Sequence, residues 1–199
     1  YEVSTPPHQD YPNNQGTPDL TATWIPLGDT PTWLGGIAIL RGSHKWGLLP
    51  LDMHPGPGNR QAKVPLEMLE ACRWVTTDFH VGDVLMFPSM TVHAALHNAS
   101  EVNLRLSVDF RYQLEGQPLT EITLHPHFGR LDWEDIYAGW ESDDLTYYWH
   151  DLDYEVVPFE DLLHTQWEID PDAPLHDDVT ERIQAGEVEL TQEEWGEIL

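Results

Sequence analysis

The stretch GDVLMFPSMTVHAALHNASEVNLRLSVDFRYQ, residues 82–113, contains two β-strand patterns on either side of a loop. Residues 83–88 form a short apolar run, and residues 102–113 alternate apolar with polar side chains, which is the period of a strand with two different faces. The apolar face holds Leu104, Leu106, Val108 and Phe110, and the polar face holds Arg105, Ser107, Asp109 and Arg111. Taken alone, the pattern predicts an ordinary sheet strand whose polar face lies in water.

The rest of the first two-thirds of the chain carries the same kind of signal. Short β-branched or aromatic runs, separated by Gly, Pro, Asn and Asp, lie at residues 19–27, 35–40 and 71–79. Helical patterns come late, at residues 158–166, 178–186 and 191–199. Many short strands with turns between them are typical of a sandwich or a jelly roll. We therefore predict a mainly β fold with a partly helical C-terminal extension.

Charge divides the chain into two parts. Residues 1–128 hold 13 acidic and 7 basic residues (net −6), whereas residues 129–199 hold 22 acidic and 2 basic residues (net −20). We predict a β core over the first part and an acidic extension, with a solvated surface, over the second. The extension is rich in large aromatic residues, among them Trp133, Trp140, Tyr147, Tyr148, Trp149 and Trp167. Because so many aromatics are unusual in a disordered segment, we expect the extension to pack on the core.

The composition argues against several classes of partner. A formal net charge of −26 opposes binding to nucleic acid or to an anionic membrane surface, and no apolar run is long enough to span a bilayer. Cys72 is the only cysteine, so an internal disulfide is excluded and a reducing, cytoplasmic location is expected. Because the chain begins at Tyr1, without methionine, and enters core-like sequence at once, we expect an upstream segment to be missing from it.

The segment TPPHQDYPNN, residues 5–14, places His8 and Asp10 two positions apart. Its prolines and asparagines argue against a helix and favour an exposed turn or extended segment, from which alternate side chains can reach one metal ion. A second histidine, His93, and an arginine twelve residues beyond it, Arg105, add a third ligand and a carboxylate-binding group. Two histidines and one carboxylate form the facial triad typical of non-haem Fe(II) sites, which leaves positions open for a 2-oxo acid and dioxygen.

These motifs resemble the phytanoyl-CoA dioxygenase family of Fe(II)- and 2-oxoglutarate-dependent oxygenases, and the resemblance covers roughly residues 5–113. The resemblance implies a double-stranded β-helix, which is a jelly roll of two sheets. The residues that it implies are His8, Asp10 and His93 as iron ligands, and Arg105 and Trp24 at the 2-oxoglutarate site. An arginine suits that role because its guanidinium forms a forked, charge-assisted pair with a carboxylate.

Two positions depart from the family pattern. The loop usually written Pro-Gly-Ser-His reads RGSH, with Arg41 in place of proline, and the Asn-Gly turn before it is replaced by residues 34–36. Neither change touches the ligand set. The carboxylate of Asp10 also disfavours halogenation, because related halogenases replace this ligand with a small residue so that chloride can bind iron.

The other histidines are weaker ligand candidates. His97 follows His93 by four positions, which does not define a shared face in a strand, and His44 in RGSH is expected to shape a loop. His125 and His127 form a His-x-His pair, but the intervening proline and the lack of a nearby carboxylate favour a surface turn. Histidines without any partner pattern are His54, His80, His150, His164 and His176.

The resemblance implies hydroxylation of an unactivated C–H bond in a small or amphipathic metabolite, with 2-oxoglutarate and O2 as cosubstrates and release of succinate and CO2. The alternative is a cupin-like metal-binding jelly roll, acting as an isomerase or a binding module without 2-oxoglutarate. Arg105 is the feature that favours the oxygenase, because a cupin has no fixed need for it.

Overall fold

The computed structural model describes residues 4–53, 60–160 and 162. The predicted helices at residues 178–186 and 191–199 lie outside this part of the chain, as does most of the helix predicted at residues 158–166. The strands are β1 Thr21–Pro26, β2 Ile37–Arg41, β3 Leu51–Met53, β4 Arg60–Ala62, β5 Arg73–Val75, β6 Leu85–Pro88, β7 His93–Ala95, β8 Ser107–Tyr112, β9 Leu119–Thr120 and β10 Val156–Val157. The α-helices are α1 Tyr11–Asn14, α2 Leu66–Ala71 and α3 Trp133–Tyr137, and short 3-10 turns lie at Thr32–Leu34, Ser43–Trp46, Glu121–Leu124, His127–Gly129 and Tyr148–Asp151.

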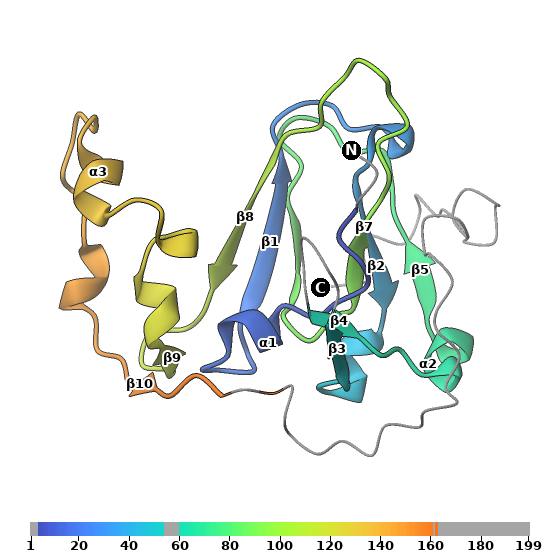
Figure 1. Ribbon diagram of the computed structural model, residues 1–199, viewed down its shortest axis with the longest axis horizontal. Coiled ribbons are helices and arrows are strands. Elements are labelled where there is room, and N and C mark those ends of the chain that lie inside the picture. The colour runs from blue at the N-terminus through green and yellow to red at the C-terminus, as the bar shows by residue number, and fades with distance from the viewer. Residues whose placement is uncertain (1–3, 54–59, 161, 163–199) are drawn as a thin grey trace.

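Two three-stranded antiparallel sheets form the core (Figure 1). One has the order β6-β1-β8 and the other the order β5-β2-β7. Along the chain, β1 lies in the first sheet, β2 and β5 in the second, β6 in the first, β7 in the second and β8 in the first. Strands that alternate between two sheets in this way form a jelly roll. The predicted mainly β, double-stranded β-helix fold is therefore confirmed.

Apolar side chains fill the space between the sheets and also cover the outer face of the second sheet. The cluster between the sheets contains Ala22, Trp24, Ile37, Ile39, Val75, Phe79, Leu85 and Phe87. Alternate residues of β2, Ala38 and Leu40, point the other way into a second cluster with Met68 of α2. Because both faces of β2 are buried, its sequence IAIL is apolar throughout rather than alternating.

The strand pattern at residues 102–113 has the opposite orientation to the one expected. Only Ser107–Tyr112 form a strand, and the apolar side chains are the exposed ones: Leu104 is 79% exposed and Phe110 is 48% exposed. The two arginines of the polar side turn inward instead, and the Arg111 side chain is only 26% exposed. The expectation that this face lies in water was wrong, because buried carboxylate and carbonyl groups inside the jelly roll accept hydrogen bonds from its arginines.

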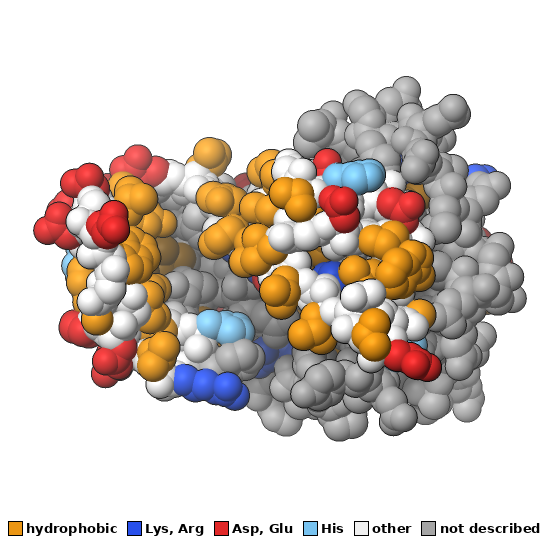
Figure 2. Space-filling model, turned by 90° about the horizontal axis from the view of Figure 1, so that it is seen from above, with side chains coloured by type: hydrophobic (Ala, Val, Ile, Leu, Met, Phe, Trp, Pro, Cys, Tyr) orange, Lys and Arg blue, Asp and Glu red, His pale blue; other side chains and the backbone are white. Residues whose placement is uncertain are grey.

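Exposed apolar side chains are frequent near the loop that joins β7 to β8, which lies at the top of Figure 1. Seen from above, Figure 2 shows hydrophobic side chains over much of this surface, with acidic side chains between them. Leu27, Val102, Leu104 and Leu106 are each more than half exposed. In the described residues, no helix is long and apolar enough to cross a membrane.

The described part of the acidic extension is tied to the core through a short strap. Glu160 and Gln15 exchange two hydrogen bonds, with N–O distances of 2.7 and 2.8 Å, and β10 pairs in parallel with β9. Farther out, the aromatic rings pack on one another: the ring of Tyr137 lies 4.8 Å from that of Trp140 and 5.0 Å from that of Tyr147. These rings act as a small core for a segment that is poor in buried aliphatic side chains.

Gly35 is a glycine at which the backbone of the jelly roll is tightly constrained. Its φ is +85°, and a Cβ at this position would lie 2.8 Å from the carbonyl oxygen of Leu96 and 2.9 Å from the backbone nitrogen of Asn98. Glycine is required here both for the left-handed conformation and for the close approach of the β7–β8 loop.

We predict that Gly35→Ala lowers the free energy of unfolding by about 2 kcal/mol or more, because it adds steric overlap with backbone atoms to the cost of a left-handed alanine. The control is Gly42→Ala, where the backbone is also left-handed, with φ +86°, but the nearest atom to the added Cβ is Sγ of Cys72 at 3.8 Å, an ordinary contact distance. This variant should lose only about 1 kcal/mol. Chemical denaturation of both variants checks the difference, and equal losses would contradict the steric argument.

Candidate metal centre

A backbone bridge between two distant segments builds the site. The amide nitrogen of His8 donates to the carbonyl of His93 at 2.9 Å, and the amide nitrogen of His93 donates to the carbonyl of His8 at 3.0 Å. The two histidines are therefore an opposed antiparallel pair whose side chains lie on the same face, with ring centroids 4.1 Å apart. The amide of Asp10 donates to the carbonyl of Ser89 at 2.9 Å, which holds the next part of the segment in place.

The segment around Asp10 differs from the exposed turn that its sequence predicts. Asp10 has helical backbone angles and precedes α1, a single turn over YPNN in which Pro12 takes an early position that needs no N–H partner. His8, Gln9 and Asp10 are 9%, 0% and 2% exposed. The expectation of an exposed turn without helix was therefore wrong, because proline is tolerated in the first turn of a helix and the segment is covered by the jelly roll.

The backbone also determines which nitrogen of each imidazole is available. Nδ1 of His8 lies 2.8 Å from the carbonyl oxygen of Pro6, and Nδ1 of His93 lies 3.0 Å from that of Thr91. Because a carbonyl oxygen only accepts hydrogen bonds, we assign the proton to Nδ1 in both rings. The lone pair of each Nε2 is then free to bind a metal, which is the usual arrangement of a metal-ligating histidine.

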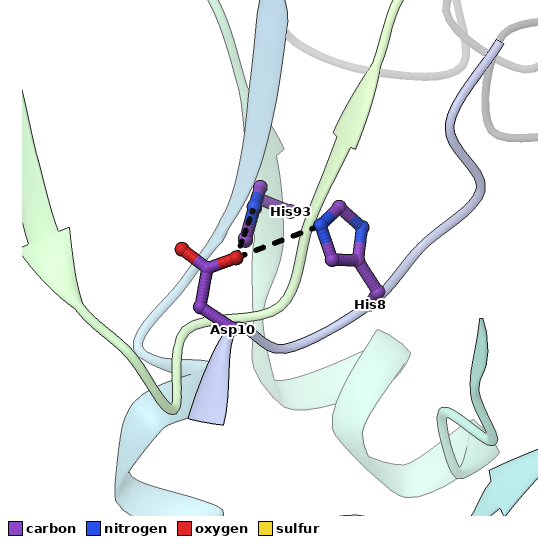
Figure 3. Close-up of side chains that lie close together, drawn as sticks. All are labelled: His8, Asp10 and His93. Carbon is purple, nitrogen blue, oxygen red and sulfur yellow. Dashed lines mark ion pairs between the residues drawn. The ribbon is translucent and has the colours of Figure 1, made fainter. Parts of the chain in front are cut away.

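The free nitrogens point toward one carboxylate oxygen (Figure 3). Oδ1 of Asp10 lies 3.8 Å from Nε2 of His8 and 3.7 Å from Nε2 of His93. All three ligand atoms lie within 4.8 Å of one another, and no other group of three or more His, Cys, Asp or Glu in the described ranges has this property. Oδ2 of Asp10 is buried and has no hydrogen-bond partner among these residues. The donor set and its unsatisfied oxygen fit a divalent cation.

The pKa values reflect the buried charges. Burial, and to a smaller extent His93, lowers the pKa of His8 to about 4, so that its imidazole is neutral at neutral pH. Burial alone would raise the pKa of Asp10, but His93, Arg111 and His8 outweigh it and hold that pKa below its ordinary value. Neutral histidine and ionised aspartate are the protonation states that metal binding needs.

Arg105 and Trp24 lie together on the inner side of the first sheet. The guanidinium carbon of Arg105 is 5.8 Å from the centroid of the Trp24 ring, and Nε and Nη1 donate to Gly35 O at 2.8 Å and to Ser107 Oγ at 2.5 Å. Burial lowers the pKa of Arg105, although an arginine remains charged. Both of these hydrogen-bond acceptors are neutral, and the five N–H donors of the guanidinium leave capacity for an anion.

Two residues that sequence reasoning did not single out also shape the site. Arg111 donates from Nη2 to Oδ1 of Asp10 at 3.0 Å. Gln9, between the two ligand candidates, points away from them: its amide nitrogen donates to the carbonyls of Gly47 and Met90, and its oxygen accepts from the amide of Leu49. The alternation in the sequence of residues 102–113 does place Arg111 on the same face as Arg105, but it does not say that this face is internal.

The other histidine candidates lie elsewhere. His97 and His44 are half-buried and take no part in the cluster, and burial lowers the pKa of His44. His125 is exposed and lies 3.9 Å from Glu121. His54, His164 and His176 lie outside the described residues.

Comparison with known protein families identifies the class to which this chain belongs. The family model described as "Phytanoyl-CoA dioxygenase (PhyH)" matches residues 2–106, which is more than half of the chain. The chain belongs to this family, and the resemblance seen in the sequence is confirmed.

The chain is similar to two curated proteins of Streptomyces, both named 1-deoxypentalenic acid 11-beta-hydroxylase. It is 30% identical to that of Streptomyces exfoliatus and 32% identical to that of Streptomyces arenae, in each case over 115 residues that cover 55% of this chain. The matched region spans 41% of the length of each hydroxylase.

Similar solved structures include the α-ketoglutarate-dependent epimerase SnoN from nogalamycin biosynthesis. It is 26% identical, with a TM-score of 0.41 and coverage of 56% of this chain and 39% of SnoN. EvdO2 from Micromonospora carbonacea var. aurantiaca, complexed with 2-oxoglutarate, is 19% identical, with a TM-score of 0.43. The match covers 59% of this chain and 50% of EvdO2.

We predict that Gln9→Ala destabilises the protein by about 3 kcal/mol, because it removes three hydrogen bonds and leaves buried carbonyl groups without donors. The isosteric Gln9→Glu should be at least as harmful, since it places a carboxylate against two carbonyl oxygens. Thermal and chemical unfolding would measure both. Gln117→Ala, whose partners are exposed, is the control and should change stability by less than about 1 kcal/mol.

Proposed function

We propose that this chain forms the catalytic core of an Fe(II)- and 2-oxoglutarate-dependent oxygenase that hydroxylates an unactivated C–H bond. The observation that supports this most strongly is the convergence of two Nε2 lone pairs and one carboxylate oxygen from His8, Asp10 and His93. Two neutral nitrogens and one anionic oxygen are the donor set of Fe(II) oxygenase sites, in which the protein occupies one face of the metal. Membership of the phytanoyl-CoA dioxygenase family supports the same class.

In this proposal, the buried residues around the centre have distinct roles. His8, Asp10 and His93 hold Fe(II), which when bound supplies the activation of O2 that is coupled to decarboxylation of 2-oxoglutarate to succinate and CO2. The backbone carbonyls of Pro6 and Thr91 keep the two imidazoles in the ligating tautomer. Apolar side chains on the inner face, including Phe87 against the His93 ring at 4.7 Å, keep bulk water away from the centre.

Arg105 is assigned to the far carboxylate of 2-oxoglutarate, and Trp24 to the wall of that subsite. Arg105 is a better candidate than Arg111, because its hydrogen-bond acceptors are neutral while Arg111 already contacts two carboxylates. The ring of Trp24 covers the guanidinium and shields its charge from water, which strengthens a pair with a carboxylate. A cupin-like protein would not need this arginine.

The substrate is proposed to be a small or amphipathic metabolite. The similarity to enzymes named 1-deoxypentalenic acid 11-beta-hydroxylase supports hydroxylation as the reaction and an organic acid as a substrate candidate. The net charge of −26 makes a highly anionic substrate less suitable, since long-range repulsion would slow its approach.

An anaerobic titration with Fe(II) and 2-oxoglutarate tests the proposal. The weak visible charge-transfer band of an Fe(II)–2-oxo acid chelate should develop in the parent protein and be absent in His8→Ala. In Arg105→Ala, the concentration of 2-oxoglutarate at half-saturation should rise about 30-fold or more, because charged hydrogen bonds contribute about 1.5–3 kcal/mol each.

The control variant is His80→Ala, which removes a histidine that is largely exposed and outside the cluster, and should leave the titration unchanged. A folded parent that binds Fe(II) but develops no band at any 2-oxoglutarate concentration would favour the cupin-like alternative. Succinate release in the presence of candidate small organic acids, 1-deoxypentalenic acid among them, then screens for substrates.

A further inference from the structure

Arg111 occupies an unusual position beside the candidate metal centre. It lies on the inner face of β8, with its side chain 26% exposed, between two carboxylates. One terminal nitrogen, Nη2, donates to Oδ1 of Asp10 at 3.0 Å, and the other, Nη1, is paired with Asp109. Asp109 is at the surface, with its side chain 55% exposed, whereas that of Asp10 is 3% exposed. Arg111 therefore links the buried ligand to a solvated carboxylate.

The Asp10 oxygen that accepts from Arg111 is the same oxygen that faces both imidazoles. Oδ1 lies 3.0 Å from Arg111, 3.8 Å from Nε2 of His8 and 3.7 Å from Nε2 of His93, while Oδ2 has no partner in the described residues. A divalent cation held by the two imidazoles and this oxygen would lie close to a guanidinium. Two cations sharing one buried oxygen repel each other strongly, because the surrounding dielectric is low.

We propose that Arg111 and a divalent metal compete for Oδ1 of Asp10. Arg111 is the counter-ion of this buried carboxylate whenever the site holds no metal, and Asp109 is the acceptor that retains Arg111 when metal binds. The pair thus tunes metal affinity and stabilises the protein before loading. This inference rests on the proposed metal centre, but not on 2-oxoglutarate or on the reaction.

A merely orienting role for Arg111 predicts the opposite sign. An arginine that only aimed Asp10 at the metal would make binding tighter, so that its removal would weaken binding. A competing arginine makes binding weaker, so that its removal tightens binding while it destabilises the metal-free protein. The sign of the change in metal affinity therefore separates the two roles.

The experiment measures Mn(II) affinity from the EPR signal of free Mn(II), with the whole chain and without cosubstrate. Arg111→Met removes the charge but keeps much of the side-chain bulk, and it should lower the Kd for Mn(II) about tenfold or more. Asp109→Asn removes the alternative acceptor and should raise the Kd several-fold. In the Arg111→Met background, Asp109→Asn should have no effect on the Kd, because the arginine through which it acts is absent.

Thermal unfolding provides a second readout. Arg111→Met should have a lower Tm than the parent without metal and a larger rise in Tm on addition of Mn(II). If Arg111→Met does not fold without metal, the test relies on Asp109→Asn, which retains Arg111. A rise in its Kd for Mn(II) supports competition between Arg111 and the metal.

The outcomes distinguish failure of the proposed metal centre from failure of the proposed competition. A parent that binds no Mn(II) contradicts the metal centre itself. Binding that is lost in His8→Ala but is unchanged or weaker in Arg111→Met overturns the competition alone. The competition is also overturned if the Kd of Asp109→Asn for Mn(II) equals that of the parent or falls below it.

Discussion

The antiparallel bridge between His8 and His93 is the contact on which the site depends. It consists of two backbone hydrogen bonds of 2.9 and 3.0 Å, and it places two imidazoles from opposite ends of the jelly-roll sequence side by side. Backbone pairing is a good support for a metal centre because it does not rely on flexible side chains. Gln9 strengthens the support from the other side, since its buried amide ties the same segment to the loops that contain Gly47 and Met90.

Electrostatics at the centre follow from burial. Asp10 is a carboxylate with almost no exposed surface, and a buried anion requires compensation by cations or hydrogen-bond donors. Arg111 supplies one cation, and the candidate metal would supply another at the same oxygen. Arg105, just before β8, and Arg111, within it, therefore have different environments. Arg105 donates to neutral acceptors and is suited to an external anion, while Arg111 is already paired with carboxylates within the protein.

Much of the fold was predictable from local sequence. The apolar runs at residues 35–40 and 83–88 and the alternating run ending at residue 113 correspond to β2, β6 and β8, because β-branched and aromatic residues between turn-forming residues have few alternatives to a strand. The family motifs also brought His8, Asp10 and His93 into consideration. Very short strands such as β3 and β9 were not predicted, since two or three residues carry no measurable periodicity.

The sequence by itself determined which segments form the main strands and that the chain is acidic. It also determined the presence of two histidines, one aspartate and the arginines, at the spacing typical of the phytanoyl-CoA dioxygenase family. Only the tertiary structure decided three features: which face of β8 points inward, that residues 8–10 are buried just before a helical turn, and that Oδ1 of Asp10 faces Arg111 as well as both histidines. The physical reason is that alternation is symmetric: a strand pattern distinguishes two faces but does not say which of them meets water. That choice depends on the partners that distant segments provide, and here those partners are a buried carboxylate and the carbonyl of Gly35.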